Sequence, residues 1–440
     1  MTLAPEELKG AAPTDRRNVF AKSNRCGLLA LLARISMQNP STIIACPDCG
    51  KAQALPPVRS GNRLACCRCR NTLESVRGNS VDRSLAFSLA TLFLLFPANL
   101  MTLLRISVAG VERSSLLGSG IVGMAIQGWV PLAIVVGLQG VLLPFLRFGL
   151  LSAALATIRL DLRNAWTGRM FRWSEHLDLW AMPDVFLIGA AVGYSRVAPH
   201  MPVSIGPGGW CLIASAVFAM LTRASLDRRA IWQVIGLPAP VSEGPLISCT
   251  TCDLLVPAGM AGEECPRCRA RLWQRQPFSL MRASALVAAG YLLYPVANYF
   301  PMSVQIQLNQ VTNHTIASGI EQLLSAGLWP LAILIFCTSI AIPLLKLCGL
   351  TWLIWSVRYH SDRRLVMKTR IYRLIVEIGR WSNVDVFTIA IFLPLMQFGS
   401  LLSVHAGTGA PAFLAVIVLT MMAARFFDPR LMWDNARVSA

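Results

Sequence analysis

One order of features occurs twice in this chain. Two C-x2-C motifs and four long apolar segments occupy about residues 46–227, and the same order recurs over about 249–428. A landmark inside the apolar parts recurs as well, since Pro144-Phe-Leu-Arg147 matches Pro343-Leu-Leu-Lys346 at an offset of 199 residues. Such self-similarity indicates a duplicated structural unit. The chain is therefore limited to folds that place two related units in tandem.

The apolar segments have the length of membrane spans. Of the 440 residues, 55% are hydrophobic and only 14% are charged, which is unusual for a soluble protein. A helix needs about 20 apolar residues to cross a bilayer, and eight segments come near or exceed that length. We expect spans at 85–105, 127–158, 180–198, 207–226, 283–302, 327–357, 382–402 and 411–427. The predicted fold class is an all-α polytopic membrane protein with eight transmembrane helices in two tandem four-helix units.

The basic residues predict the orientation of these spans. Of the 40 Lys and Arg, 13 precede the first span, 4 lie between the second and third, and 7 lie between the sixth and seventh. The alternate connections hold only Arg105, Arg113 and Arg196. By the positive-inside rule both termini and every basic connection are cytoplasmic. The net charge of +18 then favours contact with anionic lipid over nucleic acid, and no nucleic-acid partner is expected.

Composition and motifs also suggest where the domains begin and end. We predict a cytoplasmic tail at 1–40, a first cysteine module at 41–75 and a first four-helix unit at 80–235. A second module at 245–275 and a second unit at 280–435 follow. The sequence contains no G-x4-G-K-[ST] nucleotide-binding motif and no recognisable nucleophile motif. We therefore expect a protein that is not an enzyme.

Eight of the 13 cysteines form four C-x2-C pairs, and two such pairs make each module. Paired C-x2-C motifs at this spacing are typical of a structural zinc ribbon, in which four thiolates leave no open coordination position. Disulfides are disfavoured because the cytosol keeps thiols reduced. We expect two zinc ions, bound by Cys46, Cys49, Cys66, Cys69, Cys249, Cys252, Cys265 and Cys268. The ligands alone leave iron open, and Cys67 beside Cys66 leaves the choice between those two open.

Only a few ionisable residues fall within the predicted spans, and four of them have counterparts in the other half. Arg147 and Lys346 lie in the second and sixth, and Asp184 and Asp385 lie about one turn into the third and seventh. A charge in the hydrocarbon costs about 3 kcal/mol or more unless it is paired. We therefore predict two ion pairs, Arg147 with Asp184 and Lys346 with Asp385. The first pair is expected to be structural.

Additional hydroxyl groups accompany only the second pair. Ser339 lies seven residues before Lys346 on the same helix face, and Pro343 cannot donate to its carbonyl oxygen. Ser382 precedes Asp385 by one turn, and Thr420 lies in the eighth span. The corresponding first-half positions hold glycine or alanine, namely Gly140, Ala181 and Ala219. This asymmetry predicts a working site in the second half that consists of Ser339, Lys346, Ser382, Asp385 and Thr420.

Several of these features resemble the paraquat-inducible protein A family, including its LetA-like lipid-transport members. The residues that carry the match are the two cysteine modules, Pro97-Ala-Asn99, Val296-Ala-Asn298, Pro343-Leu-Leu-Lys346, Trp180-x3-Asp184-Val-Phe186, Trp381-x3-Asp385-Val-Phe387 and Phe427-Asp-Pro-Arg-x2-Trp433. The resemblance implies two claudin-like tetraspan units with cytoplasmic zinc ribbons in a bacterial inner membrane. It also implies a LetB-like MCE-domain partner that forms a periplasmic tunnel, phospholipids as cargo, and a polar relay at the same five residues.

The function predicted is therefore that of an inner-membrane subunit of an MCE-type intermembrane lipid transport system. It would load or unload phospholipids at the tunnel, and exchange of a proton at Asp385 beside Lys346 offers one way to drive the movement. Two alternatives are a stand-alone exporter of small amphiphiles and a metal- or redox-responsive membrane scaffold.

Overall fold

The computed structural model describes residues 43–54, 63–75, 80–108, 111–162, 164–198, 202–236, 244–307, 310–395 and 402–438. The predicted tail at 1–40 lies outside these ranges. Within them, six helical segments are long and apolar enough to cross a membrane. They are α2 (Ser80–Leu100), α4–η2–α5 (Val130–Arg159), α8 (Pro207–Ser225), α10 (Ser279–Tyr299), α12–η4–α13 (Trp329–Arg358) and Gly409–Asp434, which begins with α16 (Gly409–Phe426). The prediction of a mostly helical, polytopic membrane protein is confirmed.

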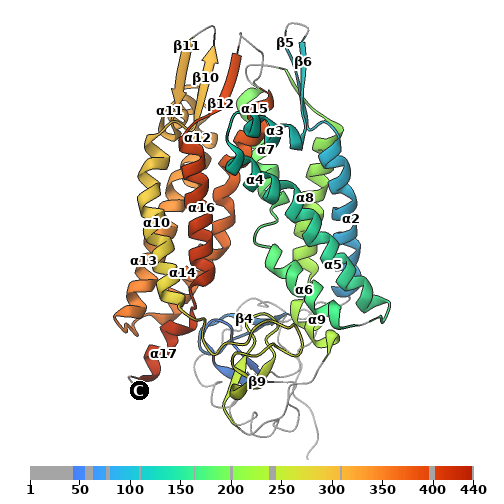
Figure 1. The fold of residues 1–440 in the computed structure, drawn as a ribbon, viewed down its shortest axis with the longest axis vertical. Helices are drawn as coiled ribbons and strands as arrows, with labels where there is room; N and C mark the ends of the chain where they lie inside the picture. The colour runs from blue at the N-terminus through green and yellow to red at the C-terminus, as the bar shows by residue number, and fades with distance from the viewer. Residues whose placement is uncertain are drawn as a thin grey trace, which may run out of the picture.

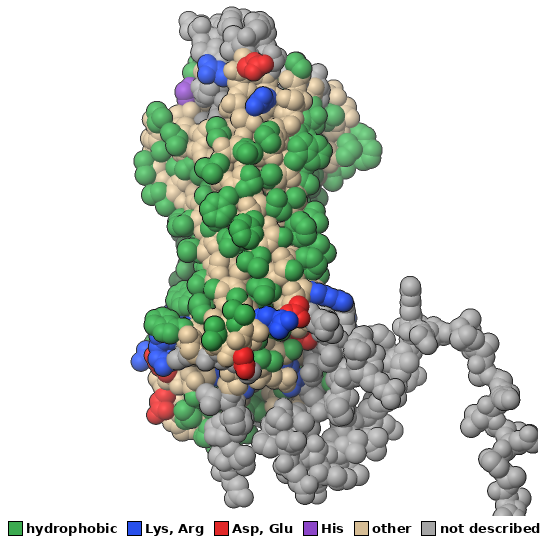
Figure 2. All heavy atoms as spheres, turned by 90° about the vertical axis from the view of Figure 1, so that its right-hand side faces the viewer, with side chains coloured by type: hydrophobic (Ala, Val, Ile, Leu, Met, Phe, Trp, Pro, Cys, Tyr) green, Lys and Arg blue, Asp and Glu red, His purple; other side chains and the backbone are tan. Residues whose placement is uncertain are grey.

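The surface supports the same assignment. Figure 2 shows a face whose middle is covered by hydrophobic side chains, with charged side chains gathered toward its two ends. Phe93 of α2 and Val217 of α8 are among the large apolar side chains that remain exposed, at 68% and 48%. Apolar side chains exposed around a helical bundle are expected where lipid, not water, surrounds it.

Each half builds its elements in the same order. The first half has α2, β5 (Leu104–Val108), β6 (Val111–Ser115), α3 (Leu117–Ile126), α4 (Val130–Gly137), η2 (Leu138–Leu142), α5 (Leu143–Arg159), α6 (Ala165–Leu177), α7 (Pro183–Val197), β7 (Val203–Ile205), α8 and α9 (Arg228–Ile235). The second has α10, β10 (Ser303–Gln307), β11 (Gln310–His314), α11 (Ile316–Ser325), α12 (Trp329–Ile335), η4 (Phe336–Ala341), α13 (Ile342–Arg358), α14 (Leu365–Ile378), η5 (Gly379–Asn383), α15 (Val384–Leu395), β12 (Leu402–Ala406), α16 and α17 (Arg430–Val438).

The strands form a small antiparallel sheet in each half, with the orders β6-β5-β7 and β11-β10-β12. The pairings correspond, since Leu104 faces Ser115 and Ile205 while Ser303 faces His314 and Ala406. Both sheets lie at one end of the bundle (Figure 1), which we call the sheet side. The expectation of an all-α fold missed these strands. Each has only three to five residues and adjoins an apolar helix, so hydropathy merges the two.

Two of the eight predicted spans are not among the six membrane-length helices of the described residues. Helix α7 has 15 residues and α15 has 12 described residues. At 1.5 Å per residue, α7 covers about 22 Å, less than the roughly 30 Å of hydrocarbon. Both helices lie in the central core, where the rings of Phe186 and Phe387 are 5.1 Å apart. Their shared burial between the halves explains why they are as apolar as a lipid-facing span.

The second long helix of each half widens into a π-helical segment. Segment η2 ends just before Pro144, and η4 ends just before Pro343. Because proline has no N–H, the carbonyl group one turn earlier lacks its helical partner, and the turn is free to widen. The widened turn in the second half holds Ser339, whose side chain is buried.

Three further hairpins build the cysteine modules. Ribbon 1 (described residues of 43–75) pairs β1 (Ile43–Ala45) with β2 (Ala52–Ala54) and β3 (Arg63–Ala65) with β4 (Thr72–Ser75). Ribbon 2 (residues 246–272) pairs β8 (Leu246–Ser248) with β9 (Leu255–Pro257). Figure 1 places β4 and β9 at the end opposite the sheets, which we call the ribbon side.

The ribbons dock crosswise. Ribbon 1 packs on the second half, where Asp48 accepts a 2.6 Å hydrogen bond from Arg373 of α14 and Arg68 stacks over the ring of Trp433 of α17. Ribbon 2 packs on the first half, in a core that it shares with Phe171 of α6 and Trp232 of α9. Each cysteine module thus precedes one unit in the sequence and contacts the other in space.

Candidate functional site

The eight predicted cysteine ligands form two buried four-sulfur clusters. In ribbon 1 the sulfurs of Cys46 and Cys69 are 3.4 Å apart and those of Cys49 and Cys66 are 3.6 Å apart. All ligand atoms in each cluster lie within 4.8 Å of one another. A tetrahedral metal with bonds of about 2.3 Å would hold its sulfurs about 3.8 Å apart, so the donors fit one ion. Cys66 belongs to the cluster, whereas Cys67 is exposed.

Ribbon 2 repeats this geometry, with sulfur separations of 3.5 Å for Cys249–Cys268 and 3.6 Å for Cys252–Cys265. In both ribbons the residue after the second cysteine of each pair has a positive φ. These residues are Gly50 (67°), Arg70 (60°), Asp253 (55°) and Arg269 (56°). This left-handed residue closes each turn, so that both sulfurs of a pair face the same point.

The predicted relay residues form two hydrogen-bonded groups. Ser339 on η4 contacts the carboxylate of Asp385 on α15, and its hydroxyl also lies 2.7 Å from the carbonyl oxygen of Ile335. A hydroxyl has one hydrogen to donate. When Ser339 donates to Ile335, a protonated Asp385 can donate to Ser339; when Asp385 is ionised, Ser339 donates to it. The geometry therefore accommodates Asp385 with and without its proton.

Lys346 belongs to the other group. Its ammonium lies 3.4 Å from the carbonyl oxygen of Gly379 and 3.5 Å from the hydroxyl of Ser382, and the side chain is 2% exposed. No ion pair joins Lys346 to a carboxylate within the part of the chain that the structure describes, so the predicted Lys346–Asp385 pair is wrong. Ser339 and Lys346 lie seven residues apart, or about 10 Å along the helix. Asp385 of α15 contacts the helix at Ser339, and Gly379 and Ser382 of η5 contact it at Lys346.

Thr420 lies outside both groups. It is fully buried on α16, where its hydroxyl donates to Ile417 of the same helix over 2.9 Å. Sequence reasoning missed Asn383 and Thr388, which are buried on either side of Asp385. The amide of Asn383 contacts the sulfur of Met182, and the hydroxyl of Thr388 lies 3.2 Å from the carbonyl oxygen of Gly189. Both are polar residues in an apolar segment, two residues before and three residues after Asp385, and this proximity in the sequence could have identified them.

The first half contains a denser network of charges. Arg147 pairs with Asp178, and Arg223 of α8 bridges Asp178 at 2.8 Å and Asp184 at 2.7 Å. Arg380 of η5 also pairs with Asp184 and so links the halves. The predicted direct pair of Arg147 with Asp184 is therefore wrong, because Arg223 lies between the two carboxylates.

Asp178 lies outside the membrane-length helices and is ionised in this network. Burial opposes its ionisation, but Arg147 and Arg223 outweigh burial and hold the pKa of Asp178 at about 2. Salt bridges join the three arginines and two aspartates of this network. Its tight pairing fits the structural role expected for the first half.

Comparison with known proteins assigns the chain to a family. A family model described as Paraquat-inducible protein A matches residues 81–236 and 280–437. The chain is 32% identical over 409 residues to the Intermembrane transport protein PqiA of Escherichia coli (strain K12), which covers 89% of this chain and 95% of that relative. It is 28% identical over 399 residues to the Lipophilic envelope-spanning tunnel protein A of the same strain, a match that covers 88% of this chain and 90% of that relative.

A third relative is the Probable intermembrane transport protein of Haemophilus influenzae, 24% identical over 412 residues, with 90% of this chain and 96% of the relative covered. No solved structure matches. The match extends over both halves and, with the cysteine clusters, agrees with the motifs singled out in the sequence. This chain is a member of the paraquat-inducible protein A family.

Proposed function

We propose that this protein is the inner-membrane subunit of an intermembrane lipid transport system and passes phospholipids to or from an MCE-domain tunnel protein in the periplasm. The names of its relatives, an intermembrane transport protein and a lipophilic envelope-spanning tunnel protein, support transport of lipophilic cargo between membranes. The protein acts without enzymatic chemistry. The six membrane-length helices, together with the shorter α7 and α15, form two tetraspan units within the domain boundaries predicted from the sequence.

The orientation is part of this proposal. The ribbon side faces the cytoplasm, together with both termini, and each ribbon holds one zinc ion as a structural element. The basic residues flanking the ribbon-side ends of the helices support this topology. Alkaline phosphatase fused near Thr408 should be active and the same fusion near Gly244 should be silent. The opposite pattern would reverse the assignment.

One observation carries the transport mechanism: the second half holds a buried amine and a buried carboxylate that do not neutralise each other. Asp385 contacts Ser339, whereas Lys346 faces Gly379 and Ser382. In the first half the corresponding charges are bound in salt bridges. Gain and loss of a proton at Asp385 then changes the bonds of Ser339 in the widened turn and couples protonation to the shape of that helix.

Near-isosteric substitutions test this mechanism. Asp385→Asn removes the charge and the proton site, and Lys346→Met removes the amine; we expect both to abolish transport at a normal protein level. Asp184→Asn is the matched control, which should act by lowering abundance because it breaks a structural network. Equal losses at Asp184 and Asp385 that follow protein abundance would show that both sites are structural.

The cargo and the partner require a separate test. Purification from the native membrane, followed by mass spectrometry of lipids and proteins, should recover phospholipid together with an MCE-domain protein. An unrelated polytopic membrane protein purified in parallel sets the background. Recovery of phospholipid without such a partner would favour the stand-alone exporter, and recovery of neither would contradict the proposed function.

A further inference from the structure

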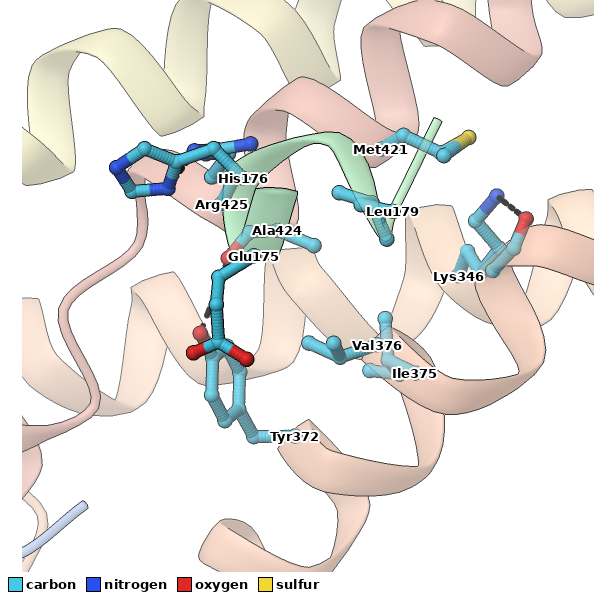
Figure 3. A pocket seen from close by; sticks show the side chains of 11 residues that line it. Glu175, His176, Leu179, Lys346, Tyr372, Ile375, Val376, Met421, Ala424 and Arg425 are labelled. Carbon is cyan, nitrogen blue, oxygen red and sulfur yellow. Dashed lines mark hydrogen bonds between the residues drawn. The ribbon is translucent and has the colours of Figure 1, made fainter. Parts of the chain in front are cut away.

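A cavity of about 280 Å³ lies between the two halves, on the ribbon side of the relay. Glu175 and His176 of α6 line it from the first half, and the second half of α14 and the end of α16 line it from the second. Figure 3 shows Lys346 at one end of the cavity and His176 with Arg425 at the other. Lys346 lies 12 residues before the ribbon-side end of α13 at Arg358, which is about 18 Å along the helix.

The hydrogen bonds of Lys346 are incomplete. An ammonium carries three N–H donors, and the two acceptors that Lys346 finds among the described residues lie at 3.4 and 3.5 Å, longer than the usual 2.9 Å or so. A buried cation whose charge is not fully compensated is destabilising. Lys346 lines the cavity, so the cavity is where further groups can complete the shell of the ammonium.

Water is the occupant that fits. At about 30 Å³ per molecule, the cavity has room for roughly nine waters. Between its ends the wall is apolar, formed by side chains such as Leu179, Ile375 and Val376 (Figure 3). A chain of waters in such a passage bonds mainly to its neighbours and to the polar groups at each end.

The outer end contains groups that exchange protons. Arg425 donates to Nδ1 of His176 over 2.9 Å, and burial together with Arg425 lowers the pKa of His176 to about 4, so its ring is neutral at pH 7. Glu175 pairs with Arg228, yet burial raises its pKa. The other titratable groups that line the cavity are Tyr372 and Lys346 itself.

We propose that this cavity is a water-filled proton access route that connects Lys346 with the ribbon side, with Glu175 and His176 as its entry groups. The inference rests on the proposed function, in which the ribbon side is cytoplasmic and the relay uses protons. It assigns the two relay groups to different sides. Lys346 exchanges with the cytoplasm, whereas Asp385 lies beyond it toward the sheet side.

Cysteine accessibility tests the route. Val376 lines the cavity, and Leu345 lies beside Lys346 in the chain but is 67% exposed on the lipid-facing surface. Each is replaced by cysteine in a background in which the five cysteines outside the two four-sulfur clusters, including Cys67, are serine. The probe is the anionic, membrane-impermeant sulfonatoethyl methanethiosulfonate, which reacts with thiolates in contact with water. It is added to inverted vesicles and, separately, to right-side-out vesicles.

Val376→Cys should react at least about tenfold faster than Leu345→Cys, because the thiolate forms only where water reaches it, and only in inverted vesicles. Adding Met421→Trp should fill the cavity and remove the reaction of Val376→Cys. Equal rates at the two positions, or faster reaction from the other side, would overturn the access route. Absence of labelling at Val376→Cys, as expected if a lipid headgroup or packed side chains fill the cavity, would also overturn the access route. Because labelling needs neither partner nor transport, its outcome is separate from that of the proposed function.

Discussion

Two glycines at matching positions predict opposite effects of the same substitution. Gly120 of α3 and Gly319 of α11 are both the fourth residue of corresponding helices. A Cβ at position 120 would lie 1.7 Å from the carbonyl oxygen of Ala390 in α15, whereas one at position 319 would meet no atom within 4 Å. The first half therefore closes tightly onto α15, the helix that carries Asp385, and α11 has open space at the equivalent point.

The magnitudes follow from two effects. Alanine is favoured over glycine in a helix by about 1 kcal/mol, and this is the whole effect expected of Gly319→Ala. In Gly120→Ala the new methyl group meets a backbone oxygen, which has no rotamer to escape into, so α3 and α15 must move apart by on the order of 1.5 Å. Overpacking costs about 1–3 kcal/mol. With an overpacking cost of about 3 kcal/mol, the upper end of that range, and a helix-propensity gain of about 1 kcal/mol, Gly120→Ala loses about 2 kcal/mol of stability. The two variants then differ in stability by about 3 kcal/mol.

Heating in detergent followed by size-exclusion chromatography measures both variants against the unchanged protein. Gly319→Ala should raise the temperature at which half of the monodisperse peak remains, and Gly120→Ala should lower it. Transport should fall only in Gly120→Ala, because displacement of α15 separates Asp385 from Ser339. If both variants shift in the same direction, or Gly319→Ala is the less stable, the close contact at Gly120 is not as described.

Three further predictions concern the ribbons and the ribbon-side charges. Native mass spectrometry should find two zinc ions per chain and one in Cys252→Ser; a folded protein without metal would contradict the four-thiolate sites. Arg373→Met breaks the 2.6 Å bond to Asp48, so it should weaken the docking of ribbon 1 by about 1–2 kcal/mol and speed proteolysis of the ribbon. Arg370→Met, at an exposed position of the same helix, is the control and should leave proteolysis unchanged. Equal cleavage of the two variants would argue against docking through Arg373. His176, with a pKa near 4 against about 6.5 when unfolded, binds fewer protons folded than unfolded, so stability should fall from pH 6.5 toward 4. His176→Gln should flatten that decline in a melting-temperature series, and an unchanged slope would contradict the assignment.

Local patterns predicted the two cysteine clusters and most of the helices. Cysteine spacing identified all eight members of these clusters because each turn is built from four consecutive residues. Hydropathy found six membrane-length helices but did not separate α7 and α15 from them, because burial between the halves demands the same apolar residues as burial in lipid. Crossed docking of the ribbons was not predictable from either pattern. It depends on how the two halves face each other.

The partners of the buried charges were harder to predict for a similar reason. Arg147 and Asp184 both have charged second-half counterparts, which draws attention to them, whereas Arg223 lies near the end of a predicted span and has none. The comparison of halves that singled out Ser339 also identifies Arg223 and Asp178. At the offset of 201 residues that relates Trp180 to Trp381, Arg223 corresponds to Ala424 and Asp178 corresponds to Gly379. Both pairs of positions differ in charge, and both first-half residues belong to the network.

These two differences explain why the halves behave unlike each other. In the first half, the Asp178 carboxylate neutralises Arg147 and the Arg223 side chain fills the adjoining space. In the second half, Gly379 offers Lys346 only a carbonyl oxygen, and Gly379 and Ala424 both line the cavity. The loss of one acid and one long side chain thus leaves an amine with an incomplete shell and room for water beside it. One duplicated scaffold thus holds a first half whose buried charges meet in salt bridges and a second half whose buried amine meets a carbonyl and a hydroxyl group.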